Sequence, residues 1–245
     1  MKIVKLRLNE TVCYLIPVEN KYLLIDTGYE KHKHLFRKRL RDLNISVNDL
    51  AYVLLTHHHD DHCGLLNEIK AHNPACKIIM HAKAIPHLQK GKDDLTNCKY
   101  INAGVGMMMK TVKRFNKKWD FAFPPYEVRS NDIVIERETA LKTIGIKIPG
   151  KIIYTPGHTD DSIALLLDNG ICFTGDAASN MLRFMGTRYC VIFMADLNQY
   201  YKNWERLIAE KAKMIYPAHG KPFKIEKLKN NLYKNKEERM IRVED

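Results

Sequence analysis

The chain has 245 residues, of which 45% are hydrophobic and 28% are charged. This composition excludes a disordered or fibrous protein and predicts a single globular domain over residues 1–245. Lys and Arg outnumber Asp and Glu by 40 to 28, a formal charge of +12. The excess fits an anionic partner such as nucleic acid, but Lys enrichment also serves solubility.

Neither export nor membrane insertion is indicated. No run approaches the roughly 20 apolar residues that cross a bilayer. Residues 1–10 alternate apolar and polar side chains and lack the apolar core of a secretory signal. The six cysteines form no C-x-x-C pair, so no disulfide framework is expected. These features predict a cytoplasmic protein without membrane contact, of open oligomeric state.

The first half of the chain begins with β structure and then alternates strands and helices. An antiparallel meander is expected from strands at 2–8, 11–18 and 21–25, which short polar turns connect. Apolar spacing then predicts a helix at 31–43, a buried strand at 50–55, a helix at 62–71, a strand at 77–80 and a basic helix at 99–118.

The second half predicts another sheet. After a break at Pro124-Pro125, strands are expected at 133–135, 141–148, 152–155, 163–167 and 171–174. These are followed by an amphipathic helix at 198–209, a short strand at 214–216 and a Lys/Glu-rich helix or tail at 225–245. Two sheets with interleaved helices predict an α/β protein with a four-layer αββα sandwich.

The segment Thr56-His57-His58-His59-Asp60-Asp61-His62 follows a predicted buried strand and precedes a predicted helix. Residues two apart in an extended segment point the same way, so His57 and His59 can share a metal ion. Asp61 and His62 lie where the helix begins and project differently, so they can meet a second ion.

Three further candidate ligands follow later predicted strands: His158, Asp176 and His219. Strand-terminal loops are where sheet proteins gather binding groups, and a carboxylate such as Asp176 can bridge two ions. A lone His or Asp at one of these places would more often be structural. Four His and two Asp within residues 56–62 are different, because burying them without metal would leave unpaired charge and imidazole.

The pattern His57-x-His59-x-Asp61-His62, followed by His158, Asp176 and His219, resembles the signature of the metallo-β-lactamase superfamily. Asp26, in Leu24-Ile25-Asp26-Thr27-Gly28, matches that family's first motif. The resemblance implies that His57, His59 and His158 hold one metal ion, that Asp61, His62 and His219 hold a second, and that Asp176 bridges them. Asp26 would fix the motif loops by hydrogen bonds, with a plain turn residue as the alternative.

This site indicates a metal-dependent hydrolase. Two divalent ions that share a water lower its pKa toward roughly 7 and generate a hydroxide that attacks an ester, thioester, lactone or phosphoester. By the resemblance, Asp61 would orient the nucleophile and then protonate the leaving group. Zinc is the expected metal, although mixed imidazole and carboxylate ligands also accept Mn or Fe.

Sequence differences from known subfamilies limit the class of substrate that we expect. Secreted β-lactamases would carry an export signal and a Cys where this chain has Asp176. Glyoxalase II-like hydrolases depend on a further helical region, whereas this chain ends soon after His219. Acyl-homoserine lactonases use a Tyr shortly after the bridging Asp, where Ala177-Ala178-Ser179-Asn180 stand here. We therefore expect a small-molecule ester, thioester or lactone as substrate, without a named compound.

Three alternatives stay open. A phosphodiesterase or nuclease would use basic residues for its substrate, and one run supplies Lys110, Lys113, Arg114, Lys117 and Lys118. Against it, the Asp26-Thr27-Gly28 opening resembles the small-molecule hydrolases of the family more closely. The second alternative is an iron-dependent oxidoreductase relative with one iron per chain. The third is a metal-binding scaffold without catalysis.

Residues 82–150 are expected to cap the metal cleft. Met107-Met108-Met109, Phe121 and Phe123 could line it, although core packing is the favoured interpretation. His58 and Asp60 are expected to support the ligands or face solvent, and Cys63 to be a small helix residue. The histidines outside these motifs carry no functional prediction.

Overall fold

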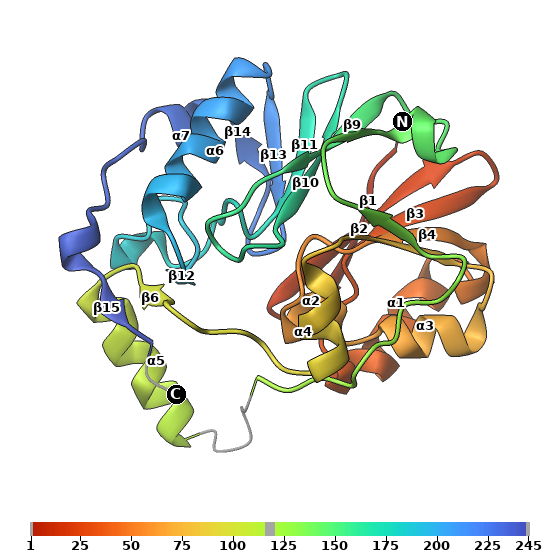
Figure 1. Cartoon of the computed structure of the whole chain (residues 1–245), viewed down its shortest axis with the longest axis horizontal. Coiled ribbons are helices and arrows are strands. Elements are labelled where there is room, and N and C mark those ends of the chain that lie inside the picture. Colours follow the sequence, from red (N-terminus) through yellow and green to blue (C-terminus); the bar gives the residue numbers. More distant parts are fainter. Residues whose placement is uncertain (1, 116–120, 244–245) are drawn as a thin grey trace.

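Two six-stranded sheets lie face to face in the computed structural model, which describes residues 2–115 and 121–243. Helices cover the outer face of each sheet, so the layers run helix, sheet, sheet, helix across the molecule (Figure 1). The four-layer αββα sandwich predicted from the sequence is therefore confirmed. No helix of the described residues has the length and apolar character to cross a membrane.

The first sheet has the order β1-β2-β3-β4-β5-β7. Its first three strands form the expected antiparallel meander, and the following three pairings are parallel. The strands are β1 (Val4–Leu8), β2 (Thr11–Val18), β3 (Lys21–Ile25), β4 (Leu50–Leu54), β5 (Lys77–His81) and β7 (Ile133–Ile135).

The second sheet has the order β14-β13-β11-β10-β9-β8. All its pairings are antiparallel except the one between β11 and β13. The strands are β8 (Thr139–Ala140), β9 (Gly150–Tyr154), β10 (Ile163–Leu167), β11 (Ile171–Gly175), β13 (Met214–Pro217) and β14 (Phe223–Lys224).

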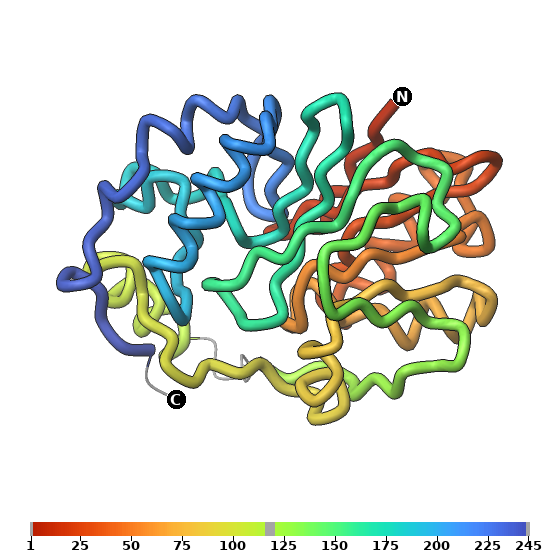
Figure 2. Tube along the Cα trace, turned by 45° about the horizontal axis from the view of Figure 1, so that its top comes forward, coloured from red at the N-terminus to blue at the C-terminus, as the bar shows by residue number. Residues whose placement is uncertain are grey.

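The helices divide between the outer layers. The first sheet is covered by α1 (Lys33–Asp42), α2 (Asp60–Cys63), α3 (Leu66–His72) and α4 (Ala84–Lys90), and the second by α6 (Leu197–Ala209) and α7 (Glu226–Lys229). Helix α5 (Ala103–Phe115) lies farther out, where its Gly106 approaches Tyr100 and Ile241 (Figure 1). A small third sheet joins β6 (Lys99–Tyr100) to β12 (Phe193–Met194) and β15 (Ile241–Arg242). The C-terminal strand β15 thus lies beside β6, which is more than 100 residues earlier in the sequence, as Figure 2 shows.

Alternation along the strands separates three apolar clusters. In β2, Cys13 and Leu15 pack under the helices of the first sheet, whereas Tyr14 and Ile16 face the second sheet. In β10, Leu166 packs under α6 while Leu165 joins the cluster between the sheets. Successive side chains of a strand point to opposite faces, so both faces of each sheet are buried and the four-layer arrangement follows.

Several predicted elements were wrong in detail. Residues 141–148 do not form a strand: Leu141–Ile144 is a 3-10 helix that ends at Gly145, whose φ of +82° turns the chain. Strand β7 belongs to the edge of the first sheet and not to the second.

Two predicted helices are divided. The helix predicted at 62–71 is split into α2 and α3, and the one predicted at 99–118 begins with strand β6. Lys117 and Lys118 lie outside the described residues. The tail at 225–245 contains only the short helix α7, a 3-10 turn and strand β15 over its described part.

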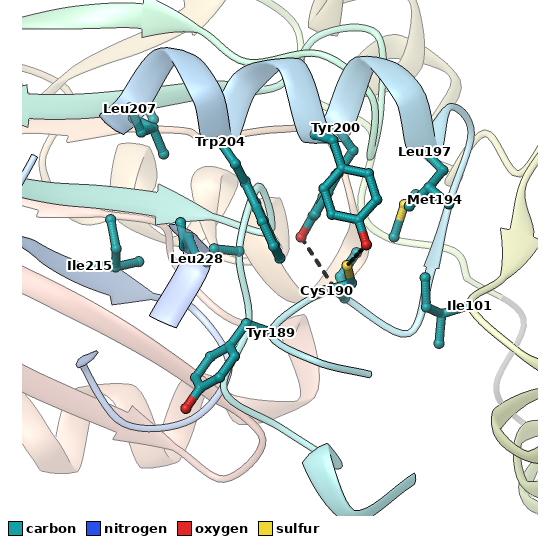
Figure 3. Close-up of a cluster of buried hydrophobic side chains, with 14 of the residues drawn as sticks. Ile101, Tyr189, Cys190, Met194, Leu197, Tyr200, Trp204, Leu207, Ile215 and Leu228 are labelled. Carbon is teal, nitrogen blue, oxygen red and sulfur yellow. Dashed lines mark hydrogen bonds between the residues drawn. The ribbon is translucent and has the colours of Figure 1, made fainter. Parts of the chain in front are cut away.

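Helix α6 fixes a loop at the edge of the second sheet. Its side chains Tyr200 and Trp204 project from one face into a buried cluster (Figure 3). The Trp204 indole Nε1–H donates to the carbonyl of Ala177 over 2.7 Å, and the Tyr200 hydroxyl donates to the carbonyl of Asp176 over 2.8 Å. The loop that follows β11 is therefore held by two hydrogen bonds from one helix.

Replacing Trp204 by Ala is expected to lower the free energy of unfolding by about 3–5 kcal/mol, because a fully buried indole leaves a cavity and Ala177 loses its donor. Urea unfolding followed by circular dichroism measures the change. Phe184→Ala is the control: its ring is 88% exposed, and a change within about 0.5 kcal/mol is expected. Equal effects of the two substitutions would contradict this account of α6.

Candidate metal centre

The seven predicted ligands converge at one edge of the sandwich. His57 and His59 follow β4 of the first sheet, and α2 supplies Asp61 and His62. The second sheet supplies the other three from loops after β9, β11 and β13, namely His158, Asp176 and His219. The carboxyl ends of β4, β11 and β13 thus bring residues far apart in sequence into one group.

His57, His59 and His158 form the first half of the centre. Their candidate ligand atoms all lie within 4.8 Å of one another. Within this group, His158 Nε2 lies 3.0 Å from His59 Nδ1. Three imidazoles in this arrangement could hold one divalent ion and leave a coordination position for another group.

Asp61, His62 and His219 form the second half, again with candidate ligand atoms within 4.8 Å. His219 Nε2 lies 3.2 Å from one oxygen of Asp61, and His62 Nε2 lies 3.4 Å from the other. Each oxygen of the Asp61 carboxylate therefore lies close to an imidazole.

Asp176 lies between the halves. Its Oδ2 is 3.6 Å from His158 Nε2, whereas its Oδ1 is 3.3 Å from His219 Nε2 and 3.6 Å from His62 Nε2. One oxygen faces the first cluster and the other faces the second, as a bridging carboxylate requires.

Several buried polar atoms of the centre show whether these residues fit metal ions. Within the described part of the chain, His57 Nε2, His62 Nε2 and Asp176 Oδ1 are buried without a hydrogen-bond partner. Buried polar atoms nearly always have a hydrogen-bond partner, and a role in binding a metal ion is one ordinary reason for an exception. Mixed imidazole and carboxylate donors suit Zn, Mn or Fe, so the residues fit a pair of divalent cations.

The electrostatics of the two halves differ. Burial lowers the pKa of His57, His59 and His158, which favours the neutral imidazole that binds metals. Burial also opposes protonation of His62, but Asp61, Asp26 and Asp176 outweigh it and raise its pKa to about 9. The carboxylates of Asp176 and Asp61 likewise raise the pKa of His219 well above its usual range. The protonated His62 and His219 thus balance the negative charge of the buried carboxylates, and bound metal cations could take over that role.

Hydrogen bonds from outside the cluster set which ring nitrogen faces it. His158 Nδ1–H donates to the carbonyl of Phe193 over 3.0 Å, and His219 Nδ1–H donates to the carbonyl of Glu10 over the same distance. Each contact leaves Nε2 directed into the centre. Such partners hold a metal-binding imidazole in the correct tautomer and orientation.

Asp26 ties the motif loops together, as the sequence predicted. Its carboxylate accepts from the backbone N–H of Thr56 over 2.8 Å, from the Thr56 hydroxyl over 2.9 Å and from His62 Nδ1 over 2.9 Å. The interpretation of Asp26 as a plain turn residue is therefore wrong. Thr11, which sequence reasoning missed, donates its hydroxyl to Asp61 over 2.8 Å.

His58 and Asp60 do not face solvent, since both are buried. His58 Nδ1 lies 2.8 Å from Asp161, and its ring stacks on His87 with centroids 4.1 Å apart. No sequence pattern predicted a functional role for Asp161 or His87. Cys63 is a buried residue of α2, as expected.

A cavity of about 220 Å³ adjoins the centre and is lined in part by His59, Asp61, Asp176 and His219. From the capping segment, Met108, Met109 and Phe121 line it as well. Met107 instead is 72% exposed, and Phe123 packs into the core of the first sheet. The preference for core packing was thus right for Phe123, the lining interpretation was right for Met108, Met109 and Phe121, and neither holds for Met107.

Comparisons with known proteins agree with this geometry. Residues 6–219 match the metallo-beta-lactamase superfamily. The beta-lactamase-like protein 2 homolog of Drosophila melanogaster is 24% identical over 217 residues, which cover 87% of this chain and 59% of the relative. Thioesterase pkgB of Emericella nidulans is 25% identical over 218 residues, covering 88% and 47%. The chain therefore spans about half of the length of these curated relatives.

Solved structures share the fold. A metallo-beta-lactamase superfamily protein from Sulfolobus tokodaii superposes with a TM-score of 0.61 at 19% identity, covering 99% of this chain and 90% of its own. At that identity the likeness concerns the architecture of the chain and not its reaction.

Zinc binding is expected to release protons at pH 7.5, because His62 and His219 are protonated in the metal-free chain and must lose their protons to become ligands. Since the pKa of His62 is about 9, apparent affinity should weaken as the pH falls below that value. Calorimetric titration in buffers of different ionisation enthalpy counts the protons. A binding enthalpy that is the same in every buffer would contradict the assignment.

Proposed function

This chain belongs to the metallo-β-lactamase superfamily, and we propose that it is a dinuclear metal-dependent hydrolase acting on an ester, thioester or lactone of a small molecule. His57, His59 and His158 would hold one ion, and Asp61, His62 and His219 the other. The observation that carries the proposal is Asp176, whose two oxygens face the two clusters.

The bound ions, which we expect to be zinc, would lower the pKa of a bound water and polarise the substrate carbonyl. In the net reaction, the water oxygen forms a bond to the acyl carbon and the acyl–oxygen or acyl–sulfur bond breaks. The leaving oxygen or sulfur takes a proton. The protein must therefore hold the water, direct it at the acyl carbon and move that proton.

Asp61 is suited to the proton movement because it belongs to the centre and also lines the cavity. The Thr11 hydroxyl and His219 fix one of its oxygens at 2.8 Å and 3.2 Å. A carboxylate held in this way can orient a water and pass its proton to a leaving group.

Tyr29 is a second group available to the substrate. Its side chain lines the cavity, and its hydroxyl has no hydrogen bond to the described residues. Burial, followed by the charges of Asp61 and Asp60, raises the pKa of Tyr29, so the hydroxyl stays protonated. It can therefore donate a hydrogen bond to a substrate oxygen.

The charge of the cavity favours a small-molecule substrate over nucleic acid. Glu10, Asp60 and Asp93 line it beside the ligands, and no Lys or Arg does so among residues 2–115 and 121–243. Phosphate backbones are bound through Lys and Arg. The basic residues of α5, Lys110, Lys113 and Arg114, are outside this lining, and they are what supports a phosphodiesterase as the second candidate.

Zinc-loaded protein is expected to hydrolyse p-nitrophenyl acetate, an N-acetylcysteamine thioester or a lactone at least tenfold faster than bis-p-nitrophenyl phosphate, because the cavity lacks cationic side chains in its described lining. Initial rates on protein of measured metal content give the comparison. Faster cleavage of the phosphodiester would favour the nuclease, and a single iron per chain would favour the oxidoreductase.

Asp61→Asn is expected to lower kcat by about 100-fold or more, since an amide cannot accept the proton of the water. Metal content must be measured on the same sample because Asp61 is also a proposed ligand. Asp42→Asn, an exposed carboxylate of α1, is the matched control and should leave kcat unchanged. An Asp61→Asn protein with two metals and full turnover would refute the role.

A further inference from the structure

The cavity beside the centre has an apolar wall that the proposed reaction does not by itself require. Six of its lining residues are Met108, Met109, Phe121, Val191, Ile192 and Phe193. Met108 and Met109 belong to α5, Phe121 lies between α5 and β7 in the chain, Val191 and Ile192 directly precede β12, and Phe193 is the first residue of β12. Carboxylates of Glu10, Asp60 and Asp93 lie elsewhere in the lining, so the cavity has an apolar and a polar side.

The apolar wall starts at the metal centre itself. The Phe193 ring packs against His59 and His158, with centroids 5.6 Å and 5.4 Å apart. A substrate carbonyl placed at the centre therefore has Phe193 beside it. The group attached to that carbonyl would continue along the wall toward Met108 and Met109.

The three consecutive methionines of α5 have different surroundings. Met108 and Met109 line the cavity, whereas Met107 is 72% exposed to solvent. Methionine side chains are flexible and polarisable, and they adapt to apolar ligands of varied shape. The same stretch of helix thus offers two residues to test and one matched control.

The size of the cavity limits what it can hold. Its volume of about 220 Å³ lies below the roughly 300–1,000 Å³ that is typical of sites for drug-sized ligands. A short acyl chain fits such a space, and a polymer segment does not. A charged acyl group would lose its hydration against the wall without gaining a partner.

We propose that the cavity selects substrates with a short, uncharged, apolar acyl group, seated against Met108, Met109 and Phe193. The inference rests on the proposed hydrolase function, whose substrate class it narrows. It makes the residues of α5 specificity determinants of the reaction.

The test is a series of acyl groups on one leaving group, with acetyl, butyryl, hexanoyl, octanoyl and dodecanoyl N-acetylcysteamine thioesters and p-nitrophenyl esters. With zinc-loaded protein, kcat/KM should rise about fourfold for each buried methylene until the wall is filled, and then fall. The succinyl compound, which replaces the butyryl methyl by a carboxylate, should be at least tenfold poorer than butyryl. Equal kcat/KM along the series, or a preference for succinyl, would overturn the proposal.

Substitutions in α5 test which side chains cause the dependence of kcat/KM on acyl chain length. Met108→Trp should move the optimum to shorter chains and Met108→Ala to longer ones. Met107→Trp and Met107→Ala alter an exposed neighbour and should reproduce the profile of the unaltered protein. Identical profiles for the Met108 and Met107 variants would overturn the assignment of the wall.

Binding to metal-free protein separates this inference from the proposed function. Without metal the thioester stays intact, and calorimetry should show hexanoyl binding at least tenfold more tightly than acetyl, a gain that Met108→Trp reduces. If this holds while zinc-loaded protein hydrolyses nothing in the series, the hydrolase proposal fails and the acyl site stands. If hydrolysis occurs without chain-length dependence in rate or binding, the acyl site fails and the hydrolase stands.

Discussion

The structure depends most on the attraction between buried carboxylates and imidazoles at the edge where the two sheets meet. Asp61 and Asp176 are nearly inaccessible to water and are surrounded by His62, His158 and His219. Buried carboxylates are costly unless opposite charge balances them. In the metal-free chain, protons on imidazoles provide that balance, and divalent ions would provide more of it. The fold must therefore hold loops from both sheets at hydrogen-bonding distance.

Packing around the centre achieves this placement. Asp26 binds Thr56 and His62, so the loop after β4 is fixed to the first sheet. Helix α6 holds the loop after β11 through Trp204 and Tyr200. At the contact between these loops, Gly175 has a φ of +50°, and a Cβ there would collide with the Thr56 side chain. A residue without a side chain therefore allows the two loops to approach.

Sequence patterns predicted the sandwich, the positions of most strands and the group of seven side chains, because alternation and strand-terminal loops are local signals. These patterns failed where tertiary contacts determine the local conformation or the partner of a side chain. Residues 141–148 are apolar enough for a strand, yet Gly145 ends a 3-10 turn there. The hydrogen bond from Thr11 to Asp61 joins residues 50 apart in the sequence, so no local pattern predicts it. It forms because β2 begins beside the centre. Which methionine of α5 faces the cavity likewise depends on how the helix packs against the small third sheet.

The central claim is that seven side chains together hold two divalent ions. Anomalous diffraction at the zinc edge, from crystals of zinc-loaded protein, tests it most directly. The account predicts two peaks per chain. One lies within about 2.0–2.2 Å of nitrogens of His57, His59 and His158, the other lies as close to nitrogens of His62 and His219 and an oxygen of Asp61, and Asp176 is in contact with both. No peak at this edge of the sandwich, or a single ion without contact to Asp176, would contradict it.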